Sequence, residues 1–360
     1  MAMLDFTSAL YLGLRHPAGS GRPWPALSLG LPAALQLPPG AASVASELAS
    51  LQGCETATLL PSTLHLFWDL FGLLAQRGTV ICVEAGTYAI ACWGIERAAS
   101  LGATVHGFAA ADALDLERLL TRTAAGRRQL LIVCDGFRPG SERQSPIAHY
   151  ATLAARHRGC LVLDDTQALG VLGRQGGGSV RRHGLEGAPV LIGASLAKAF
   201  GAPLAVLAGS GPLVRGFEAR SQTRVHTSPP SLAVIEAARH ALTLNRACGD
   251  RLRAHLRRRV RQFRARLAAL RLRCSGGEFP VQSLSPVAGI DMPALHAALL
   301  QRQVRTVLHA DGAQARLSFV FTAAHTAACI ERAVQALVQA LVQLLDAPRH
   351  SFHPLTAEAS

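Results

Sequence analysis

Short runs of apolar, often β-branched residues alternate along the chain with longer segments in which apolar residues recur every three or four positions. Segments such as 90–101 and 147–157 have this helical spacing. The alternation predicts β-α units, and hence an α/β fold with a mostly parallel sheet covered by helices on both faces. The apolar runs lie at 79–83, 104–107, 130–134, 160–164, 190–194 and 204–208, with a further strand-like run at 56–60.

The segments before and after the predicted sheet differ from it in composition and in the spacing of apolar residues. Residues 1–42 are rich in proline and glycine and predict an arm with little regular structure; a helix is expected over 43–53, with Ser43 as its cap. The large domain is predicted over 43–240, and the spacing over 231–273 predicts one or two long helices. Shorter apolar segments and helices at 291–303 and 327–345 then predict a small α+β domain over 241–346. Residues 347–360 are expected to form a flexible tail.

The composition excludes a disordered chain, because 49% of the 360 residues are hydrophobic and only 16% are charged. We expect no membrane span, since no apolar run of about 18 residues is free of charges and helix breakers. We also expect no secretory signal, since residues 1–17 lack a charged start followed by an apolar core. The eight cysteines are scattered without a CxxC pair, which favours neither a zinc site nor a disulfide framework. A cytoplasmic, reduced protein is the simplest interpretation.

The net charge of +13 is compatible with a nucleic acid as a partner. Ten arginines lie between positions 251 and 273, where leucine, valine and phenylalanine recur at three- and four-residue steps. This pattern predicts an amphipathic helix. A solvated basic face is favoured over a nucleic-acid surface, since no recognition motif or aromatic interleaving accompanies the charge. An acidic substrate, a carrier protein or coenzyme A phosphates could also use it.

Lys198 is the only lysine in the chain, and it lies between two alanines just after the apolar run 190–194. Lysine forms Schiff bases, and an apolar setting lowers its pKa so that the free amine can attack a carbonyl. The alternative is codon bias that has left one lysine by chance. Asp164 and Asp165 end the run 160–163, where buried carboxylates are costly without a partner. A protonated pyridine nitrogen would be such a partner; a helix cap or a metal ligand is the alternative, and no His/Glu cluster nearby favours a metal.

Two segments together resemble a known family. Asp164–Gly170 (Asp-Asp-Thr-Gln-Ala-Leu-Gly) and Ser195–Gly201 (Ser-Leu-Ala-Lys-Ala-Phe-Gly) resemble the pyridoxal-phosphate (PLP) enzymes of aspartate-aminotransferase fold, also called fold type I. Among these the chain is most similar to the α-oxoamine synthases, such as 8-amino-7-oxononanoate synthase and 2-amino-3-ketobutyrate CoA ligase. Tyr11–Leu14 and Thr322–His325 also match that family, and the resemblance covers about residues 5–345. It implies a seven-stranded sheet and a smaller C-terminal domain.

The resemblance implies a role for each matching residue. Lys198 would hold pyridoxal 5'-phosphate and shuttle protons, Asp164 would pair with the pyridine nitrogen, and Gln167 would contact the phenolic oxygen. Tyr88 would stack on the cofactor ring. The phosphate would be bound by Ser62, Thr63, Leu64 and Ser195, and by Thr227 and Ser228 from a neighbouring subunit. These last two imply a homodimer with sites at the subunit interface.

The chain also departs from the family pattern. Gln167 stands where the family has histidine, so it can donate a hydrogen bond but carries no charge. The family's second arginine in Arg-x-Arg anchors the substrate carboxylate; here Arg316 matches the first arginine, and Ser318 takes the anchor position. A glycine/serine-rich segment that admits acyl-CoA is missing. The expected substitutes for the carboxylate anchor are Arg138, Arg224 and His226.

The resemblance predicts a PLP-dependent transferase that condenses an amino acid with an acyl thioester, either acyl-CoA or an acyl carrier. An aminotransferase or carbon–carbon lyase acting on an atypical amine or amino acid is the alternative, because such a substrate would not need the missing arginine. The third hypothesis is a binding protein that kept the fold and lost catalysis. The net charge of +13 would suit a DNA-associated protein of this kind. The retention of both Asp164 and Lys198 argues against it.

Overall fold

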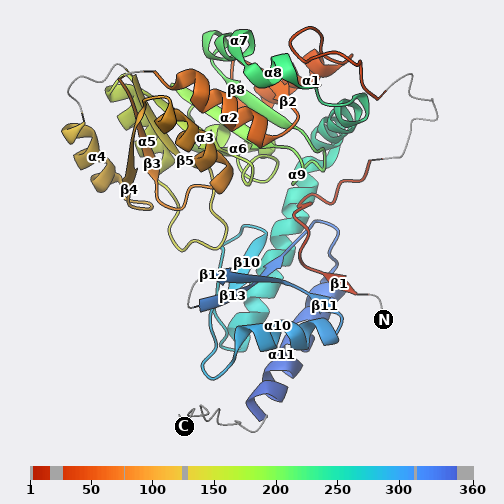
Figure 1. Cartoon of the computed structure of the whole chain (residues 1–360). Coiled ribbons are helices and arrows are strands. Elements are labelled where there is room, and N and C mark those ends of the chain that lie inside the picture. Colours follow the sequence, from red (N-terminus) through yellow and green to blue (C-terminus); the bar gives the residue numbers. More distant parts are fainter. Residues whose placement is uncertain (1–2, 17–26, 77, 124–128, 312–313, 347–360) are drawn as a thin grey trace, which may run out of the picture.

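The computed structural model describes residues 3–16, 27–76, 78–123, 129–311 and 314–346. It consists of a large domain built on a wide sheet and a smaller C-terminal domain (Figure 1). The long helix α9 (Leu232–Ala269) runs from one domain into the other. The predicted boundary at 240/241 lies inside this helix, so one continuous helix belongs to both domains.

The central sheet has seven strands, as the resemblance implies. β8 runs antiparallel to both of its neighbours, and the remaining pairs are parallel. The predicted α/β fold with a mostly parallel sheet is therefore confirmed, and each strand starts or ends within about two residues of its predicted run. In spatial order the strands are β2 (Thr56–Leu60), β8 (Ala205–Gly209), β7 (Val190–Ser195), β6 (Cys160–Asp164), β5 (Gln129–Asp135), β3 (Thr79–Glu84) and β4 (Thr104–Phe108).

Helices cover both faces of the sheet because the side chains of each strand alternate between two apolar clusters. Leu131 and Val133 of β5 pack toward one face, covered by α2 (Thr63–Leu74), α3 (Ala89–Ser100) and α7 (Gly211–Arg220). Leu130 and Ile132 pack toward the other face. The helices on that face are α1 (Ala41–Gln52), α4 (Ala113–Arg122), α5 (Ile147–Arg156), α6 (Gly178–His183) and part of α9.

Helix α1 begins two residues before the predicted start. Its N-cap is Gly40, with a φ of 83° that suits glycine, and Ser43 lies inside the first turn. The prediction that Ser43 caps the helix is therefore wrong. Gly53 ends the helix as predicted, in a left-handed conformation whose N–H donates to the carbonyls of Ala49 and Ser50.

The small domain contains an antiparallel sheet in the order β12-β13-β10-β9, packed against two helices. Helix α11 is long and apolar enough by length and composition to cross a membrane. One of its faces is buried, and it packs against α9 and α10 in this domain. The elements are β9 (Cys274–Ser275), β10 (Val281–Leu284), α10 (Met292–Gln301), β11 (Val304–Arg305), β12 (Val307–Asp311), β13 (Gln314–Val320) and α11 (Ala327–Asp346).

The described parts of the N-terminal arm, 3–16 and 27–42, have little regular structure, yet the first of them is packed into the protein. β1 (Leu4–Asp5) pairs in parallel with β11 of the small domain. Phe6 and Tyr11 are almost fully buried. His325 stacks on Phe6 with ring centroids 4.4 Å apart, and one of its ring nitrogens lies 3.0 Å from the Asp5 carbonyl oxygen. The segment Thr322–His325 thus holds the arm in place. The predicted tail at 347–360 lies outside the described residues.

The two carboxylates that end β6 point in opposite directions. Asp165 continues the side of the strand that carries Leu161 and Leu163, and it is fully buried against α6. Its carboxylate accepts hydrogen bonds from the Ser179 N–H at 2.8 Å and the Ser179 hydroxyl at 2.5 Å. A Cβ added to Gly178, which has a φ of +78°, would overlap this carboxylate. Asp165 is therefore a structural group that fastens α6 to the sheet.

We expect Gly178→Ala to lower the free energy of unfolding by about 3 kcal/mol or more, because it adds a steric overlap to the strain of a positive φ. Gly187→Ala is the matched control: Gly187 has a φ of +79°, and a Cβ there meets nothing within 4 Å. This control should lose only about 1–2 kcal/mol. Urea-induced unfolding of both variants measures the difference, and equal losses would contradict the assigned role of Asp165.

Candidate active site

Reactive side chains gather at the edge of the sheet where the parallel strands end. Asp135, Asp164 and Ser195 are the last residues of β5, β6 and β7, three adjacent strands. By alternation each follows the face of Val133, Val162 or Leu191, which is the face covered by α2 and α3. This is the position where open α/β sheets bind their ligands.

A cavity of about 360 Å³ opens at this edge. It brings together six of the residues selected from the sequence: Lys198, Asp164, Gln167, Tyr88, Arg138 and Arg316. The other lining residues are Gly86, Asp135, Phe137, Pro139, Gly140, Ser141 and Thr166. The volume lies at the lower end of the range of small-molecule sites.

Lys198 lies in the turn that follows β7, and its side chain is largely buried. Burial lowers the pKa of Lys198, while the nearby carboxylates Asp164 and Asp135 act in the opposite direction. Burial also raises the pKa of Asp164, and hydrogen bonds from Thr166 and the charge of Lys198 oppose that rise. The site therefore holds an amine with a lowered pKa beside a carboxyl group that lacks the solvation of water.

Gln167 is held by a residue from the distant N-terminal arm. The hydroxyl of Tyr11 donates a 2.6 Å hydrogen bond to Gln167 Oε1. Burial raises the pKa of Tyr11, so the phenol keeps its proton and acts as the donor. Because the amide oxygen is occupied, the Nε2 group of Gln167 is the end that remains to donate a hydrogen bond to a group in the cavity.

Asp135 lines the cavity and was not selected from the sequence. It lies beside Asp164 in the strand register, and its Oδ1 accepts the backbone N–H of Tyr88 at 3.1 Å. Burial and the neighbouring Asp164 raise the pKa of Asp135 to about 7. The signal was available, because Asp135 directly follows the predicted strand 130–134 just as Asp164 ends the next one.

The predicted phosphate-binding residues lie at the same edge of the sheet but outside the cavity lining. Ser62 caps α2, with its Oγ 2.8 Å from His65 Nδ1, while Leu64 is exposed. Leu60 pairs with Ala205, which pairs with Ser195. Two strand spacings, about 10 Å, thus separate the end of β2 from Ser195. The N-terminus of α2 presents free backbone N–H groups there, the usual donors to a phosphate.

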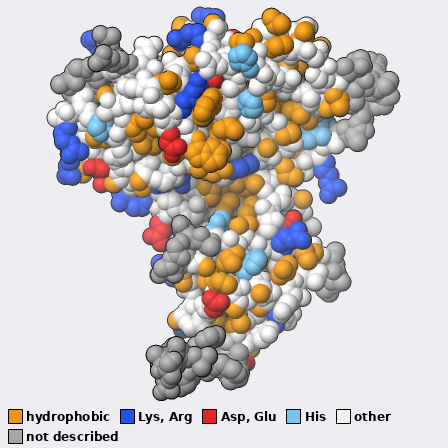
Figure 2. All heavy atoms as spheres, viewed as in Figure 1, with side chains coloured by type: hydrophobic (Ala, Val, Ile, Leu, Met, Phe, Trp, Pro, Cys, Tyr) orange, Lys and Arg blue, Asp and Glu red, His pale blue; other side chains and the backbone are white. Residues whose placement is uncertain are grey.

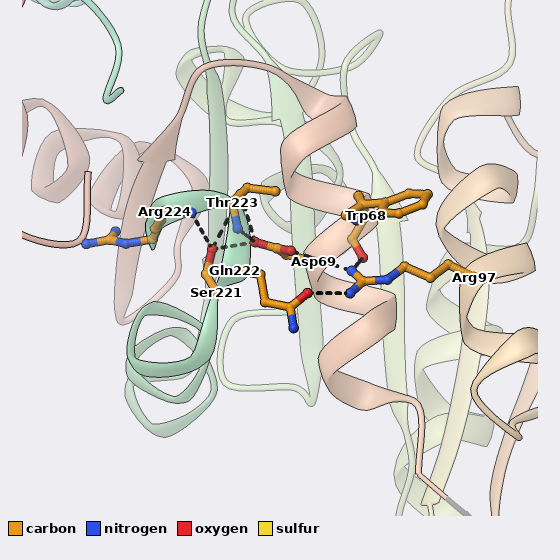
Figure 3. Close-up of polar contacts among 7 residues, drawn as sticks. All are labelled: Trp68, Asp69, Arg97, Ser221, Gln222, Thr223 and Arg224. Atoms are coloured by element: carbon orange, nitrogen blue, oxygen red, sulfur yellow. Dashed lines mark hydrogen bonds and ion pairs between the residues drawn. The ribbon is translucent and has the colours of Figure 1, made fainter. Parts of the chain in front are cut away.

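A polar network fixes the short helix α8 (Gln222–His226) against α2 and α3 (Figure 3). Asp69 Oδ2 accepts the hydroxyls of Ser221 at 2.5 Å and Thr223 at 2.7 Å. Arg97 donates to the Gln222 side chain and the Trp68 carbonyl, both at 2.7 Å. Because α8 leads directly into Thr227 and Ser228, this network sets the position of both residues.

Thr227, Ser228 and His226 do not line the cavity of their own chain. The Thr227 hydroxyl donates to the Thr223 carbonyl at 2.7 Å, and His226 and Ser228 are exposed. Arg224 also lies outside the cavity, where it donates to Thr58 Oγ1 at 3.0 Å and pairs with Glu218 at 3.3 Å. The two residues proposed as alternative carboxylate anchors on this segment, His226 and Arg224, are therefore not brought to Lys198 within one subunit.

Arg138 and Arg316 are the arginines that the structure does bring to the cavity. Arg138 Nη1 donates to the Ala85 carbonyl at 2.6 Å, and its buried Nε makes no hydrogen bond to any described residue. Ser318, predicted to bind substrate, has no exposed surface, and its hydroxyl lies 2.7 Å from Ser283 Oγ. It lies on the same face of β13 as Arg316, but Ser283 covers it, so Ser318 is not part of the cavity lining.

The residues at the cavity suit a phosphorylated pyridine aldehyde. The amine of Lys198 suits the aldehyde, and the buried Asp164 carboxyl suits a ring nitrogen that carries a proton. Gln167 Nε2 is placed to donate, and the α2 N-terminus offers N–H groups toward an anion. Among the described residues no group of three or more His, Cys, Asp and Glu side chains is arranged to hold a metal ion.

Comparison with known proteins agrees with this geometry. Residues 35–337 match the family described as aminotransferase class I and II. The 8-amino-7-oxononanoate synthases of Thioalkalivibrio sulfidiphilus and Alkalilimnicola ehrlichii are each 34% identical to this chain, over 64% and 78% of its length. The matched regions span 60% and 71% of those two proteins.

A solved structure has the same fold. Serine palmitoyltransferase of S. paucimobilis, with bound PLP–myriocin, superposes with a TM-score of 0.84 at 16% sequence identity. The superposition covers 95% of this chain and 88% of the other. At 16% identity this similarity establishes the fold alone. The chemistry of the site is inferred from the residues that line the cavity.

The Tyr11–Gln167 contact can be measured with a double-mutant cycle. Tyr11→Phe keeps the aromatic packing on Phe279 and removes only the hydroxyl. Together with Gln167→Ala, we expect a coupling energy of about 1 kcal/mol in the free energy of unfolding, typical of a hydrogen bond between partly buried groups. Losses that simply add would show that the arm does not position Gln167.

Asp135 makes stability depend on pH. Its carboxyl ionises near 3.8 when the chain is unfolded and near 7 in the folded protein. The contribution of Asp135 to stability is therefore present below pH 4 and is lost as pH rises toward 7. Asp135→Asn should raise the Tm of cofactor-free protein at pH 8 by a few degrees, with little change at pH 4.5. An equal Tm difference at both pH values would contradict the burial of this carboxyl.

Proposed function

The chain belongs to the class I and II aminotransferases, and within them to the PLP-dependent α-oxoamine synthases, and from this membership we propose that it condenses an amino acid with an acyl thioester. In the overall reaction, a carbon–carbon bond forms between the α-carbon and the acyl carbon, and the carbon–sulfur bond breaks to release a thiol. The carboxylate leaves as CO₂, or an α-proton is lost instead.

One observation carries this proposal: the only lysine of the chain and the Asp164 carboxyl share a single cavity at the carboxyl edge of the sheet. When bound there, pyridoxal phosphate supplies a ring that draws negative charge away from a substrate α-carbon. Lys198 would hold the aldehyde carbon and move a proton to or from the α-carbon. Asp164 would keep the ring nitrogen protonated.

The other cavity residues orient and cover the ring. Gln167 Nε2, held by Tyr11, would donate to the phenolic oxygen. Tyr88 is 58% exposed at the mouth of the cavity, where its ring can cover one face of the cofactor. The α2 N-terminus with Ser62 and Thr63, together with Ser195, would bind the phosphate.

The substrate carboxylate would be bound by Arg138 or Arg316 in place of the missing anchor. Both line the cavity, and Arg138 has a buried Nε with no hydrogen-bond partner among the described residues. A guanidinium with such an unused donor is suited to a carboxylate. Ser318 is buried and lies outside the cavity lining.

We also propose that the protein works as a homodimer in the cytoplasm. Thr227 and Ser228 are placed firmly by the Asp69 network but lie outside their own cavity, which suits a contribution to a neighbouring one. Figure 2 shows hydrophobic side chains gathered on one face near the junction of the two domains, a surface that a second copy could cover. The eight cysteines are free thiols, as in a reducing compartment.

The proposed function is tested by incubating the purified holoenzyme with acyl-CoA and a panel of amino acids while free thiol and CO₂ are measured. We expect thiol release that depends on one amino acid or a few. Lys198→Ala should lower the rate by roughly 10²–10⁴-fold or more, because the proton carrier at the α-carbon is lost. It should also abolish the visible absorbance of the covalently held cofactor.

The same assay distinguishes the alternatives. Amino-group exchange with a keto acid in the absence of thiol release would favour an aminotransferase instead. An unchanged visible spectrum in Lys198→Ala would reject the cofactor assignment. Arg156→Ala is a suitable control, since this exposed residue at the end of α5 lies outside the cavity and should leave both readouts unchanged.

A further inference from the structure

The loop that follows β5 brings Arg138 to the candidate active site, and its backbone is firmly held there. The side-chain amide of Gln144 binds the backbone of Arg138 twice: Oε1 accepts the Arg138 N–H at 3.0 Å, and Nε2 donates to the Arg138 carbonyl at 2.9 Å. Pro139 disfavours a helical backbone at the residue before it. Phe137 stacks on Phe279, with ring centroids 4.2 Å apart. The start of the Arg138 side chain is therefore fixed in space.

The guanidinium group of Arg138 is held at one end only. Nη1 donates to the Ala85 carbonyl at 2.6 Å and packs against Gly86, where an added Cβ would lie 2.7 Å from it. The buried Nε makes no hydrogen bond to any described residue. Nε and Nη2 share one planar edge of the group, and such an edge can bind both oxygens of a carboxylate. Arg138 therefore brings an unused buried donor to the cavity wall.

The positive charge of Arg138 is only partly balanced by its surroundings. Burial raises the pKa of Asp135 to about 7, and the charge of Arg138 opposes that rise. A carboxyl group with this pKa carries only part of a negative charge at neutral pH. Asp135 Oδ1 accepts the Tyr88 N–H, and no hydrogen bond joins Asp135 to Arg138 in the described part of the chain. A carboxylate that enters the cavity would complete this balance.

The position of the family's carboxylate anchor is not available for this role. Ser318 occupies that position, and it is buried against Ser283 outside the cavity lining. Arg316, two residues earlier on the same strand of the small domain, does line the cavity. It already takes part in an interaction within the protein. Arg138 lies instead on the large domain, which also carries Lys198.

We propose that Arg138, positioned by Gln144, binds the carboxylate of the amino substrate, so that the anchor lies on the large domain and not on β13. This inference rests on the proposed function. It identifies the amino substrate as an amino acid with a free α-carboxylate, since a simple amine would leave the guanidinium without a partner. Gln144 lies outside the lining of the Lys198 cavity and acts on the substrate only through Arg138.

The test compares ligands that differ by one carboxylate: alanine with ethylamine, and serine with ethanolamine. Each is titrated into the holoenzyme, and its affinity is measured from the change in the visible absorbance of the bound cofactor. Carboxylate selectivity is the affinity for the amino acid divided by the affinity for its amine. Arg138→Gln should lower this selectivity roughly 10- to 100-fold, because a charge-assisted pair is lost, and should leave the affinity for amines unchanged.

Arg143→Gln is the matched control, because Arg143 is exposed on the same loop and lies outside the cavity. It should leave the carboxylate selectivity unchanged. Equal losses of selectivity in Arg138→Gln and Arg143→Gln would overturn the proposal, since the effect would then be one of overall charge. A greater loss in Arg316→Gln than in Arg138→Gln would also overturn it.

The role of Gln144 is tested by Gln144→Leu, which removes both hydrogen bonds to the Arg138 backbone and keeps a side chain of similar size. We expect the carboxylate selectivity to fall roughly three- to tenfold while the affinity for amines is retained. Equal losses of affinity for amines and amino acids would indicate a general structural role, and unchanged selectivity would indicate no role. Either result would overturn the positioning role.

Competition by formate tests the same site in the wild-type holoenzyme. Formate should weaken the apparent affinity for alanine but not for ethylamine, because the amine leaves the guanidinium of Arg138 unoccupied. Sodium chloride at the same ionic strength is the control. Equal effects of formate and chloride on the binding of alanine would contradict a carboxylate site.

Thiol release from acyl-CoA tests the proposed function separately. Selectivity that depends on Arg138, without thiol release in the presence of any amino acid, rejects the condensation while the anchor remains. Thiol release by the wild type, with unaltered selectivity in Arg138→Gln, rejects the anchor alone.

Discussion

The alternation of side chains at the end of β6 is the constraint on which the site depends. Asp164 and Asp165 are adjacent in sequence, yet one faces the cavity and the other is locked to Ser179 in the core. A shift of one residue in the register of β6 would exchange them and bury the carboxyl that must face Lys198. The parallel pairing of β6 with β5 and β7 prevents that shift, and it also brings Asp135 and Ser195 to the same edge.

Much of the fold could be predicted from the sequence, because apolar runs that alternate with helical spacing have few other interpretations. The positions of Lys198 and Asp164 followed from the same pattern, since both lie at predicted strand ends. Asp135 could have been found by that argument as well. The burial of Ser318 could not, because it depends on how β13 pairs with β10, and short strands in a small antiparallel sheet leave no clear register in the sequence.

Contacts between segments that are distant in sequence were the other feature that could not be predicted. Tyr11 and Gln167 are 156 positions apart, and no local pattern links them. The arm was predicted to lack regular structure, and its described residues largely do, but irregular backbone is compatible with firm packing when its apolar side chains are buried. Likewise, the arginines over 251–273 indicated one amphipathic helix, whereas only the structure shows that some of them turn into a cavity beside the site.

The arm also links the two domains mechanically. β1 is paired with the small domain, and six residues after its end Tyr11 supplies the hydroxyl that holds Gln167 in the large domain. A rotation of the small domain about the axis of α9 would therefore act on Gln167 through this short segment. Closure of the interdomain space and alignment of the Gln167 amide would then be a single concerted motion.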